Sequence, residues 1–362
     1  MTPLIDLKVL DFSHVIAGPF ATFYLAQLGA NVTKVEKPGG GDVMRSSARG
    51  TTQFTALNAG KQCVEIDLQS PAGRAQALEL ARTCDVLLDN FRPGVLERHG
   101  LGYAAVHAIN PRVIYCSVSG YGTLHAPWKS RGAYDHVIQA ATGMAMLAGD
   151  PGGPPVKTGF PVVDVMTGVL AAFAITAAVQ ERQRTGAGRQ VDVSMWGAAL
   201  QLMYPFSVQA LDSGESPLRV GNKGYSGSPA AEYFATAGGD FIAIGANTPE
   251  QIGKLYGVLG WPSEQAETEL EQGLGFARAR DPQAFRDKLT DALKTRSASE
   301  WESLLHAAGV PAARVRTLSE FTAEALAAGA LVPTVLQMEG NSAVTPGLGW
   351  TTTEAGLKQD HS

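Results

Sequence analysis

The fold is decided by the first repeating pattern in the chain, VLDFSHVIAGPFATFYLAQLGANVTKVE, which occupies residues 9–36. Residues 9–12 form a short apolar run, residues 19–28 have the composition of a helix, and residues 32–36 form a second β-type run. Short apolar runs on either side of a helical segment are typical of a β-α-β unit. The chain is therefore predicted to begin with two parallel strands joined by a helix.

The same pattern returns further along the chain. Residues 64–68 are predicted to be a strand, and Ser70-Pro71 carries the cap-then-proline signature of a helix start. Residues 85–88 and 113–118 are expected to be two more strands. Strands that alternate with helices predict an α/β fold whose parallel sheet is covered on both faces, as in doubly wound proteins.

A longer helix is predicted in the middle of the chain. It is expected to begin near Asp164 and to run to about Arg184, where the sequence TGAG at residues 185–188 supplies a glycine stop. Residues 190–195 are then a strand, and residues 196–211 are a second apolar helix.

The composition changes after this helix. Residues 212–229 are rich in Gly, Ser and Pro, which marks a crossing between domains. Residues 233–234 and 241–244 are predicted to pair as a hairpin around a Gly-Asp turn. Amphipathic helices are expected between residues 249 and 308. The length of 362 residues also favours two domains, because a single core rarely grows beyond about 300 residues.

Charge and cysteine content exclude several classes of protein. The formal net charge is −5 and the chain has no basic run, which argues against a nucleic-acid partner. Cys63, Cys84 and Cys116 form no C-x-x-C pair and have no histidine at metal-ligand spacing. We therefore expect buried thiols, no bound metal and a reducing compartment. The first residues lack the pattern of a secretory signal, so the expected location is the cytoplasm.

One segment has the composition of a membrane span. Residues 162–179 are almost wholly apolar, but Asp164 and Thr167 interrupt them, and Gly168 with several alanines suits close packing against other helices. A buried core helix is the favoured interpretation, and no membrane partner is expected.

Two common enzyme classes do not match the sequence. A dinucleotide site needs three glycines between the first strand and helix, whereas residues 13–19 contain only Gly18. A Ser-His-Asp hydrolase needs a G-x-S-x-G elbow, and residues 118–120 have the wrong flank for one.

Taken from the residues alone, Asp164 and His136 have ordinary structural explanations. An aspartate at a helix start is a common N-cap, which stabilises a helix by about 1 kcal/mol. A lone histidine before an apolar helix is more often a surface or core residue than a base. Composition and spacing thus reach no further than a cytoplasmic α/β enzyme.

Several ordered motifs resemble one family. They are VLDFSHVIAGP (9–19), LGANVTKVE (28–36), DNFRPG (89–94), NPRVIYCSVSG (110–120), QRTGAG (183–188) and AGVPA (308–312). Together they cover nearly the whole chain, and in this order they resemble the class III CoA-transferase family, also called CaiB/BaiF.

The resemblance implies an architecture. It consists of a large Rossmann-like domain with a parallel sheet and a small α+β domain, in an interlocked homodimer. The large domain is expected at residues 1–211, the linker at 212–229 and the small domain at 230–325. Residues 326–362 are expected to return to the large domain.

The resemblance also implies an activity and a nucleophile. The enzyme would move coenzyme A from an acyl-CoA to a carboxylic acid, and Asp164 matches the family's attacking aspartate. At a helix N-terminus in a dry cleft this carboxylate is expected to stay ionised, and backbone N–H groups are expected to hold its products. Exchange through a mixed anhydride and an aspartyl-CoA thioester requires no ATP and no metal.

Further site residues follow from motif position. Lys37, Leu68, Arg98 and the run Asn90-Phe91-Arg92 are expected to bind CoA, with Arg98 preferred because a guanidinium binds phosphate bidentately. A solvated helix charge is the alternative for Arg98. Tyr134 matches a family tyrosine near the thioester and is expected to donate a hydrogen bond to the developing oxyanion.

The sequence departs from the family pattern at several positions, and alternatives stay open. The racemase branch has a histidine where this chain has Tyr134, and a glutamate where it has Thr248. These differences favour a transferase over a 2-methylacyl-CoA racemase or epimerase, and a non-catalytic CoA-binding member is the third hypothesis. Ile16 replaces a glutamine near the oxalyl group and residues 224–229 are a poor copy of the glycine-rich loop, so a succinyl-type acyl group is preferred to formyl or oxalyl.

Overall fold

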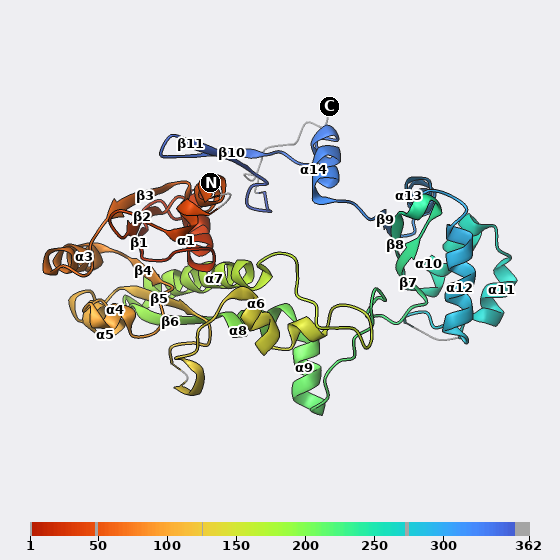
Figure 1. Cartoon of the computed structure of the whole chain (residues 1–362), viewed down its shortest axis with the longest axis horizontal. Coiled ribbons are helices and arrows are strands. Elements are labelled where there is room, and N and C mark those ends of the chain that lie inside the picture. Colours follow the sequence, from red (N-terminus) through yellow and green to blue (C-terminus); the bar gives the residue numbers. More distant parts are fainter. Residues whose placement is uncertain (1, 48–49, 125, 272–274, 352–362) are drawn as a thin grey trace. The chain divides into compact units, whose positions relative to one another are not determined.

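The computed structural model describes residues 2–47, 50–124, 126–271 and 275–351, which form two compact units (Figure 1). Unit 1 comprises Met1–Ala145, Lys157–Pro217 and Val332–Ser362, and unit 2 comprises Met146–Val156 and Leu218–Leu331.

Unit 1 is built on a six-stranded sheet in which every neighbouring pair is parallel. The strands are β1 (Lys8–Asp11), β2 (Asn31–Glu36), β3 (Lys61–Glu65), β4 (Val86–Asp89), β5 (Ile114–Ser119) and β6 (Arg189–Ser194). Their order, β3-β2-β1-β4-β5-β6, is that of a Rossmann-type doubly wound sheet. The predicted parallel α/β sheet is confirmed.

Up to residue 217 the chain also forms helices and short 3-10 turns. These are α1 (Ala17–Gln27), α2 (Gly50–Asn58), α3 (Pro71–Thr83), α4 (Val95–Arg98), α5 (Tyr103–Ile109), α6 (Asp135–Ala141), α7 (Val162–Thr185), α8 (Met195–Leu202), α9 (Tyr204–Ser213), η1 (Val43–Ser46), η2 (Ala126–Trp128) and η3 (Met144–Met146).

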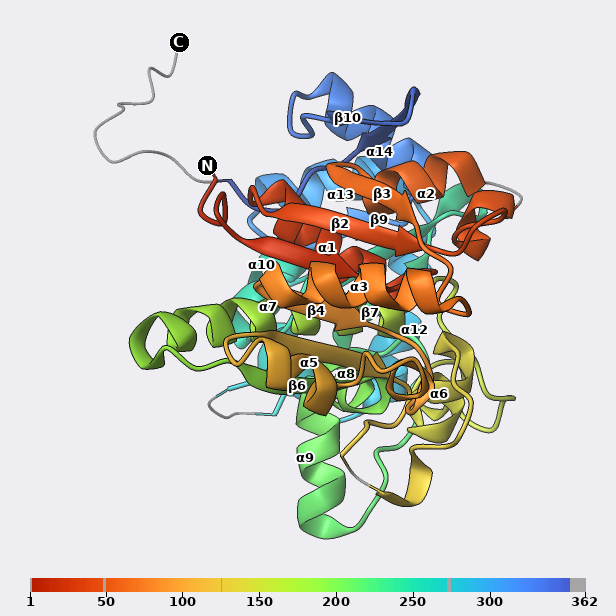
Figure 2. The same ribbon diagram turned by 90° about the vertical axis from the view of Figure 1, so that its left-hand side faces the viewer.

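Helices cover both faces of the sheet because successive strand residues point to opposite sides. Val9 and Leu88 pack with α1 and α7 in one core, whereas Leu10 and Leu87 pack with α3 and α5 in another. Figure 2 shows α3 and α5 on the near side of the strands. The apolar α7 is long enough to cross a membrane by length and composition, and in this structure it contributes Ala171 and Ile175 to the first core.

The ends of two helices follow the chemistry of their residues. Ser70 accepts the Gly73 N–H at 3.0 Å, so it caps α3, and Pro71 occupies the first turn. Gly186 ends α7 at a φ of 75° in the left-handed region that favours glycine. Both boundaries agree with the sequence prediction.

Two predicted elements differ from the structure. The third strand begins at Lys61 instead of residue 64. The reason is its pairing with β2, in which Lys61 lies opposite Val32 at one end and Glu65 lies opposite Glu36 at the other. The helix predicted over residues 196–211 is divided between α8 and α9. Pro205 explains this break, because it has no N–H for a helical hydrogen bond.

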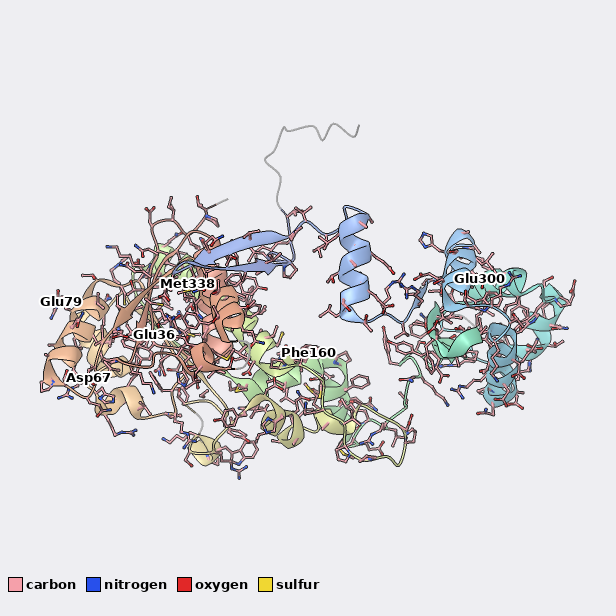
Figure 3. All side chains as sticks on the ribbon, turned by 45° about the horizontal axis from the view of Figure 1, so that its top comes forward. Glu36, Asp67, Glu79, Phe160, Glu300 and Met338 are labelled. Carbon is pink, nitrogen blue, oxygen red and sulfur yellow. The ribbon has the colours of Figure 1, made fainter. Side chains whose placement is uncertain are left out.

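The last described segment of unit 1 is an antiparallel hairpin of β10 (Thr334–Met338) and β11 (Asn341–Thr345). Leu336 is buried with Phe23 and Ala59, so the hairpin packs on the α1–α2 side of the unit. Figure 3 labels Met338 on β10 and Glu36 on β2 within this unit.

Unit 2 has a three-stranded antiparallel sheet of order β7-β8-β9. Its elements are β7 (Ala230–Ala235), η4 (Ala237–Gly239), β8 (Phe241–Ala246), α10 (Pro249–Leu259), α11 (Ser263–Glu269), α12 (Pro282–Leu293), α13 (Ala298–Ala307), β9 (Ala312–Arg314) and α14 (Leu318–Ala327). Phe234, Leu289 and Trp301 are part of its own core. The predicted hairpin is confirmed, since Ala235 pairs with Phe241 across the turn.

Candidate functional site

An open cavity in unit 1 lies at the carboxyl ends of the central strands. It is lined by residues 14–17 after β1, 90–93 after β4, 118–120 at the end of β5, and by Lys129, Arg131, Ala133, Tyr134, Asp164 and Met195. The strand order reverses direction between β1 and β4, and ligands of open α/β sheets bind at such a switch point. The sheet therefore places this cavity where a substrate is expected.

Asp164 faces this cavity from the first turn of α7. The N-cap position is occupied by Pro161, so the interpretation of Asp164 as an N-cap is wrong. The N–H groups of Val163 and Asp164 both donate to Oδ2 of Asp135, at 2.8 and 3.0 Å. Asp135, which the sequence analysis did not select, thus takes the place that the cap was expected to fill.

The protonation of Asp164 also differs from the expectation. Burial first, and the neighbouring charge of Asp135 second, raise the pKa of Asp164 to about 7. A carboxyl group with this pKa is about half ionised at neutral pH instead of fully ionised. The positive end of the helix does not offset these effects, because the Asp135 carboxylate binds the two N–H groups.

Tyr134 lines the cavity at the N-cap position of α6 and is 69% exposed. Its ring lies parallel to that of His136 with 6.3 Å between ring centroids. His136 is exposed and is not part of the cavity lining. The structure therefore brings Tyr134, and not His136, together with Asp164.

The predicted run of residues 90–92 lines the same cavity. Asn90 accepts the His14 N–H at 2.9 Å and donates from Nδ2 to the His14 carbonyl at 2.7 Å. Its amide thus fastens the β1–α1 turn to the end of β4. The Phe91 ring lies 5.1 Å from the His14 ring, while Arg92 is exposed at the rim.

The other predicted CoA residues lie elsewhere in unit 1. Lys37 lines a neighbouring open cavity, which shares His14 and Phe91 with the first. Leu68 packs against the core beneath α3, and Arg98 is exposed on α4. Neither Leu68 nor Arg98 lines one of these two cavities.

Two basic residues of the cavity were missed by the sequence analysis. Lys129 and Arg131 line it beside Arg92, so three cationic side chains border one opening. The Arg131 guanidinium lies 5.2 Å from the centroid of the Trp128 ring. The polar segment before Tyr134 could have indicated them, since Lys and Arg are typical partners of phosphate groups.

The β1–α1 turn has an unusual backbone. Val15 has a φ of 70°, although a β-branched residue is disfavoured in the left-handed region. Its N–H donates to both carboxylate oxygens of Asp42, at 3.1 and 3.2 Å. Asp42 in turn pairs with the buried Lys34 ammonium at 3.1 Å. A buried ion pair therefore holds the turn that forms one wall of the cavity.

Within the described ranges, no group of three or more His, Cys, Asp or Glu side chains has a metal-binding arrangement.

Comparison with known proteins gives a consistent result. The family model described as CoA-transferase family III matches residues 4–359. Acetyl-CoA:oxalate CoA-transferase of Acetobacter aceti is 33% identical over 323 residues, which are 88% of this chain and 82% of that protein. Succinyl-CoA:glutarate CoA-transferase of Mus musculus is 32% identical over 334 residues, which are 90% and 74% of the two chains.

A solved structure agrees over the same extent. A CAIB/BAIF family protein from Brucella suis superimposes with a TM-score of 0.80 at 31% sequence identity, covering 99% of this chain and 95% of that one.

Proposed function

The chain belongs to CoA-transferase family III and is a CoA-transferase, and we propose that Asp164 carries the CoA group covalently between two carboxylic acids. The observation that supports this role is the position of Asp164 in the cavity at the switch point of the sheet. Its pKa of about 7 leaves a large ionised fraction at neutral pH, and the ionised form is the nucleophile.

The exchange proceeds through two kinds of covalent intermediate, a mixed anhydride and an aspartyl-CoA thioester. The Asp164 carboxylate attacks the thioester carbonyl, the C–S bond breaks, and a mixed anhydride and a CoA thiolate form. The thiolate attacks the aspartyl carbonyl and releases the donor acid, which leaves an aspartyl-CoA thioester. The acceptor carboxylate attacks this thioester, the C–S bond breaks, and a second mixed anhydride and the CoA thiolate form. The thiolate then attacks the acceptor's carbonyl carbon. The new acyl-CoA leaves and the Asp164 carboxylate is restored.

Other residues of the cavity have supporting roles. Tyr134 donates a hydrogen bond to the oxyanion of each tetrahedral step. Arg92, Lys129 and Arg131 bind the phosphates of CoA at the rim, since guanidinium and ammonium groups pair with phosphate oxygens. Asn90 and Phe91 shape the wall beside them, while Lys37, Leu68 and Arg98 are assigned to CoA by their motif positions.

The acceptor acids are short dicarboxylates. Oxalate and glutarate are the acids in the names of the two relatives, and each carries a second carboxyl group, whereas the CoA donors named there are acetyl-CoA and succinyl-CoA. Succinyl-CoA is the first donor to test, with a panel of dicarboxylic and monocarboxylic acids as acceptors. Mass spectrometry of the CoA products identifies the acceptor directly.

A racemase mechanism has less support. The position of the racemases' histidine is occupied by Tyr134, and the exposed His136 does not line the cavity. Thr248, the counterpart of the racemases' glutamate, caps α10 by accepting the Gln251 N–H at 3.3 Å. The Thr248 side chain therefore has a structural role as a helix cap.

The assembly is an interlocked homodimer in the cytoplasm, without a nucleic-acid or membrane partner. Phe173 on α7 and Leu211 on α9 are 72% and 85% exposed, and a second chain would cover such large apolar side chains. Light scattering should give the mass of two 38.0 kDa chains. A monomer at micromolar concentration would contradict the dimer.

Hydroxylamine trapping tests the covalent role of Asp164. With succinyl-CoA present, hydroxylamine should inactivate the enzyme and leave a hydroxamate on the peptide that contains Asp164. Asp164→Ala should still bind CoA but lose at least about 10³-fold in kcat, as expected when a nucleophile is deleted. Near-normal exchange by this variant, or trapping at another residue, would refute the proposal.

A further inference from the structure

We propose that Asp135 is the positioning residue of this enzyme, holding the first turn of α7 in place and keeping a second negative charge beside the attacking carboxylate. The inference rests on the proposed role of Asp164. It is carried by the hydrogen bonds of the Asp135 carboxylate to Val163 and Asp164.

The two oxygens of Asp135 have different tasks. Oδ2 accepts hydrogen bonds from the backbone N–H groups of Val163 and Asp164. Oδ1 accepts a hydrogen bond from the side-chain Nε2 of Gln139. The Gln139 side chain accepts the Thr158 N–H at 2.9 Å, and Thr158 Oγ1 donates to the Phe160 carbonyl at 2.9 Å. Asp135 therefore connects α6, the segment before α7 and the first turn of α7 in one network.

Because of this network, the carboxylate of Asp164 receives no hydrogen bond from the N–H groups of Val162, Val163, Asp164 and Val165 in the first turn of α7. Val162 donates to the Phe160 carbonyl at 2.8 Å, Val165 donates to the Pro161 carbonyl at 3.1 Å, and Asp135 takes the two groups between them. The usual attraction of a helix N-terminus for an anion is thus directed at Asp135. The attacking carboxylate lies beside that anion without sharing its hydrogen bonds.

Two carboxylates at one helix start repel each other, and this repulsion favours the protonated form of Asp164. The pKa of Asp164 is accordingly raised, by burial and then by Asp135. The other charged or titratable side chains of the cavity are His14, Arg92, Lys129, Arg131 and Tyr134. Among the residues that the structure describes, Asp135 is the charged neighbour that contributes to the shift, and it raises the basicity of the nucleophile.

Asp135→Asn removes the charge and keeps the hydrogen bonds to α7. The Asn carbonyl oxygen can still accept both N–H groups, but the negative charge and the acceptor of Gln139 Nε2 are lost. The pH profile of CoA release in a single turnover should rise with the ionisation of Asp164, with its midpoint near pH 7 in the wild type. In Asp135→Asn the midpoint should fall by about half a unit or more.

Asp135→Ala removes both the charge and the hydrogen bonds. It should lower kcat by about 10-fold or more with little change in KM for the acyl-CoA, because a misplaced nucleophile slows the chemical step. Thr158→Val is the matched control, since it weakens the network away from the charge. It should lower thermal stability while the midpoint stays at the wild-type pH.

The outcomes separate this inference from the proposed function. Wild-type enzyme that is not trapped by hydroxylamine at Asp164 would refute the proposed function. Wild-type enzyme that is trapped, together with an unshifted midpoint in Asp135→Asn and normal kcat in Asp135→Ala, would overturn only the role of Asp135. If Asp135→Asn does not fold, Asp135→Glu decides, because it should keep the midpoint but lose kcat.

Discussion

The Asp164 carboxyl group links the chemistry of the site to the stability of the protein. Its pKa of about 7 in the folded chain exceeds the value of about 4 expected in an unfolded chain. The folded state therefore binds the proton more tightly, and this group costs stability progressively as the pH rises from about 4 to about 7. The ionised form that the proposed attack requires is thus the form that lowers the stability of the folded protein.

Asp164→Asn should show this cost directly. The variant carries no charge, so it should gain in Tm relative to the wild type at pH 8, where the wild-type carboxylate is ionised. The gain should disappear near pH 4, where Asp164 is protonated in the folded wild type. Thermal denaturation at the two pH values measures the difference, and an equal change in Tm at both would contradict the raised pKa.

Tyr134 and His136 form a second residue pair that can be separated by experiment. Tyr134→Phe should lower kcat by about 10-fold or more with little change in KM, because only the hydroxyl group proposed as the oxyanion donor is lost. His136→Ala should retain most of the activity, since the ring lies outside the cavity.

A deuterium-exchange experiment can contradict the roles expected for Tyr134 and His136. If the enzyme incorporates solvent deuterium at the α-carbon of 2-methylacyl-CoA without an acceptor acid, and His136→Ala abolishes the exchange, a racemase mechanism holds instead.

Among the elements, the β1–α1 turn depends on the buried pair of Lys34 and Asp42. Asp42→Asn should destabilise the protein by about 3 kcal/mol, because it leaves the Lys34 ammonium buried without its anion. Lys34→Met should also destabilise, and the double variant should lose less than the sum of the two. Urea denaturation of all four proteins measures the coupling, and strict additivity would show that the pair does not act as a unit.

The elements also show what the sequence can predict. β1, α1, β2 and α3 were predictable because their apolar periodicity, the Ser70 cap and Pro71 are local signals. The start of β3 was not, because it depends on pairing with β2 across the sheet. The break before α9 was missed although Pro205 signals it.

The residues of the site likewise fall into those that the sequence could predict and those that it could not. Motif position placed Asp164, Tyr134 and residues 90–92, and the structure brings these residues to one cavity. Asp135 could not be selected from the sequence, because its role arises from contact with a helix that begins 27 residues later at Val162. The strain at Val15 likewise becomes visible only when the backbone is known.

At the scale of the whole molecule, the C-terminal hairpin completes unit 1. Leu336→Ala should destabilise unit 1 by about 2–4 kcal/mol, because the side chain is buried against Phe23 and Ala59. Val335→Ala is the control, since Val335 is exposed on the same strand. Limited proteolysis should cut the hairpin faster in Leu336→Ala than in Val335→Ala, and equal rates would show that Leu336 does not anchor it.

The hairpin has a consequence for the order in which a newly made chain can fold. On the ribosome, α1 and α2 emerge early, but the strands that cover Phe23 and Ala59 are synthesised only after residues 218–331. At about 5–20 residues per second this interval is on the order of tens of seconds. During it, an apolar patch of the nascent first unit stays open to water and to chaperones, while the second unit can already acquire its own core.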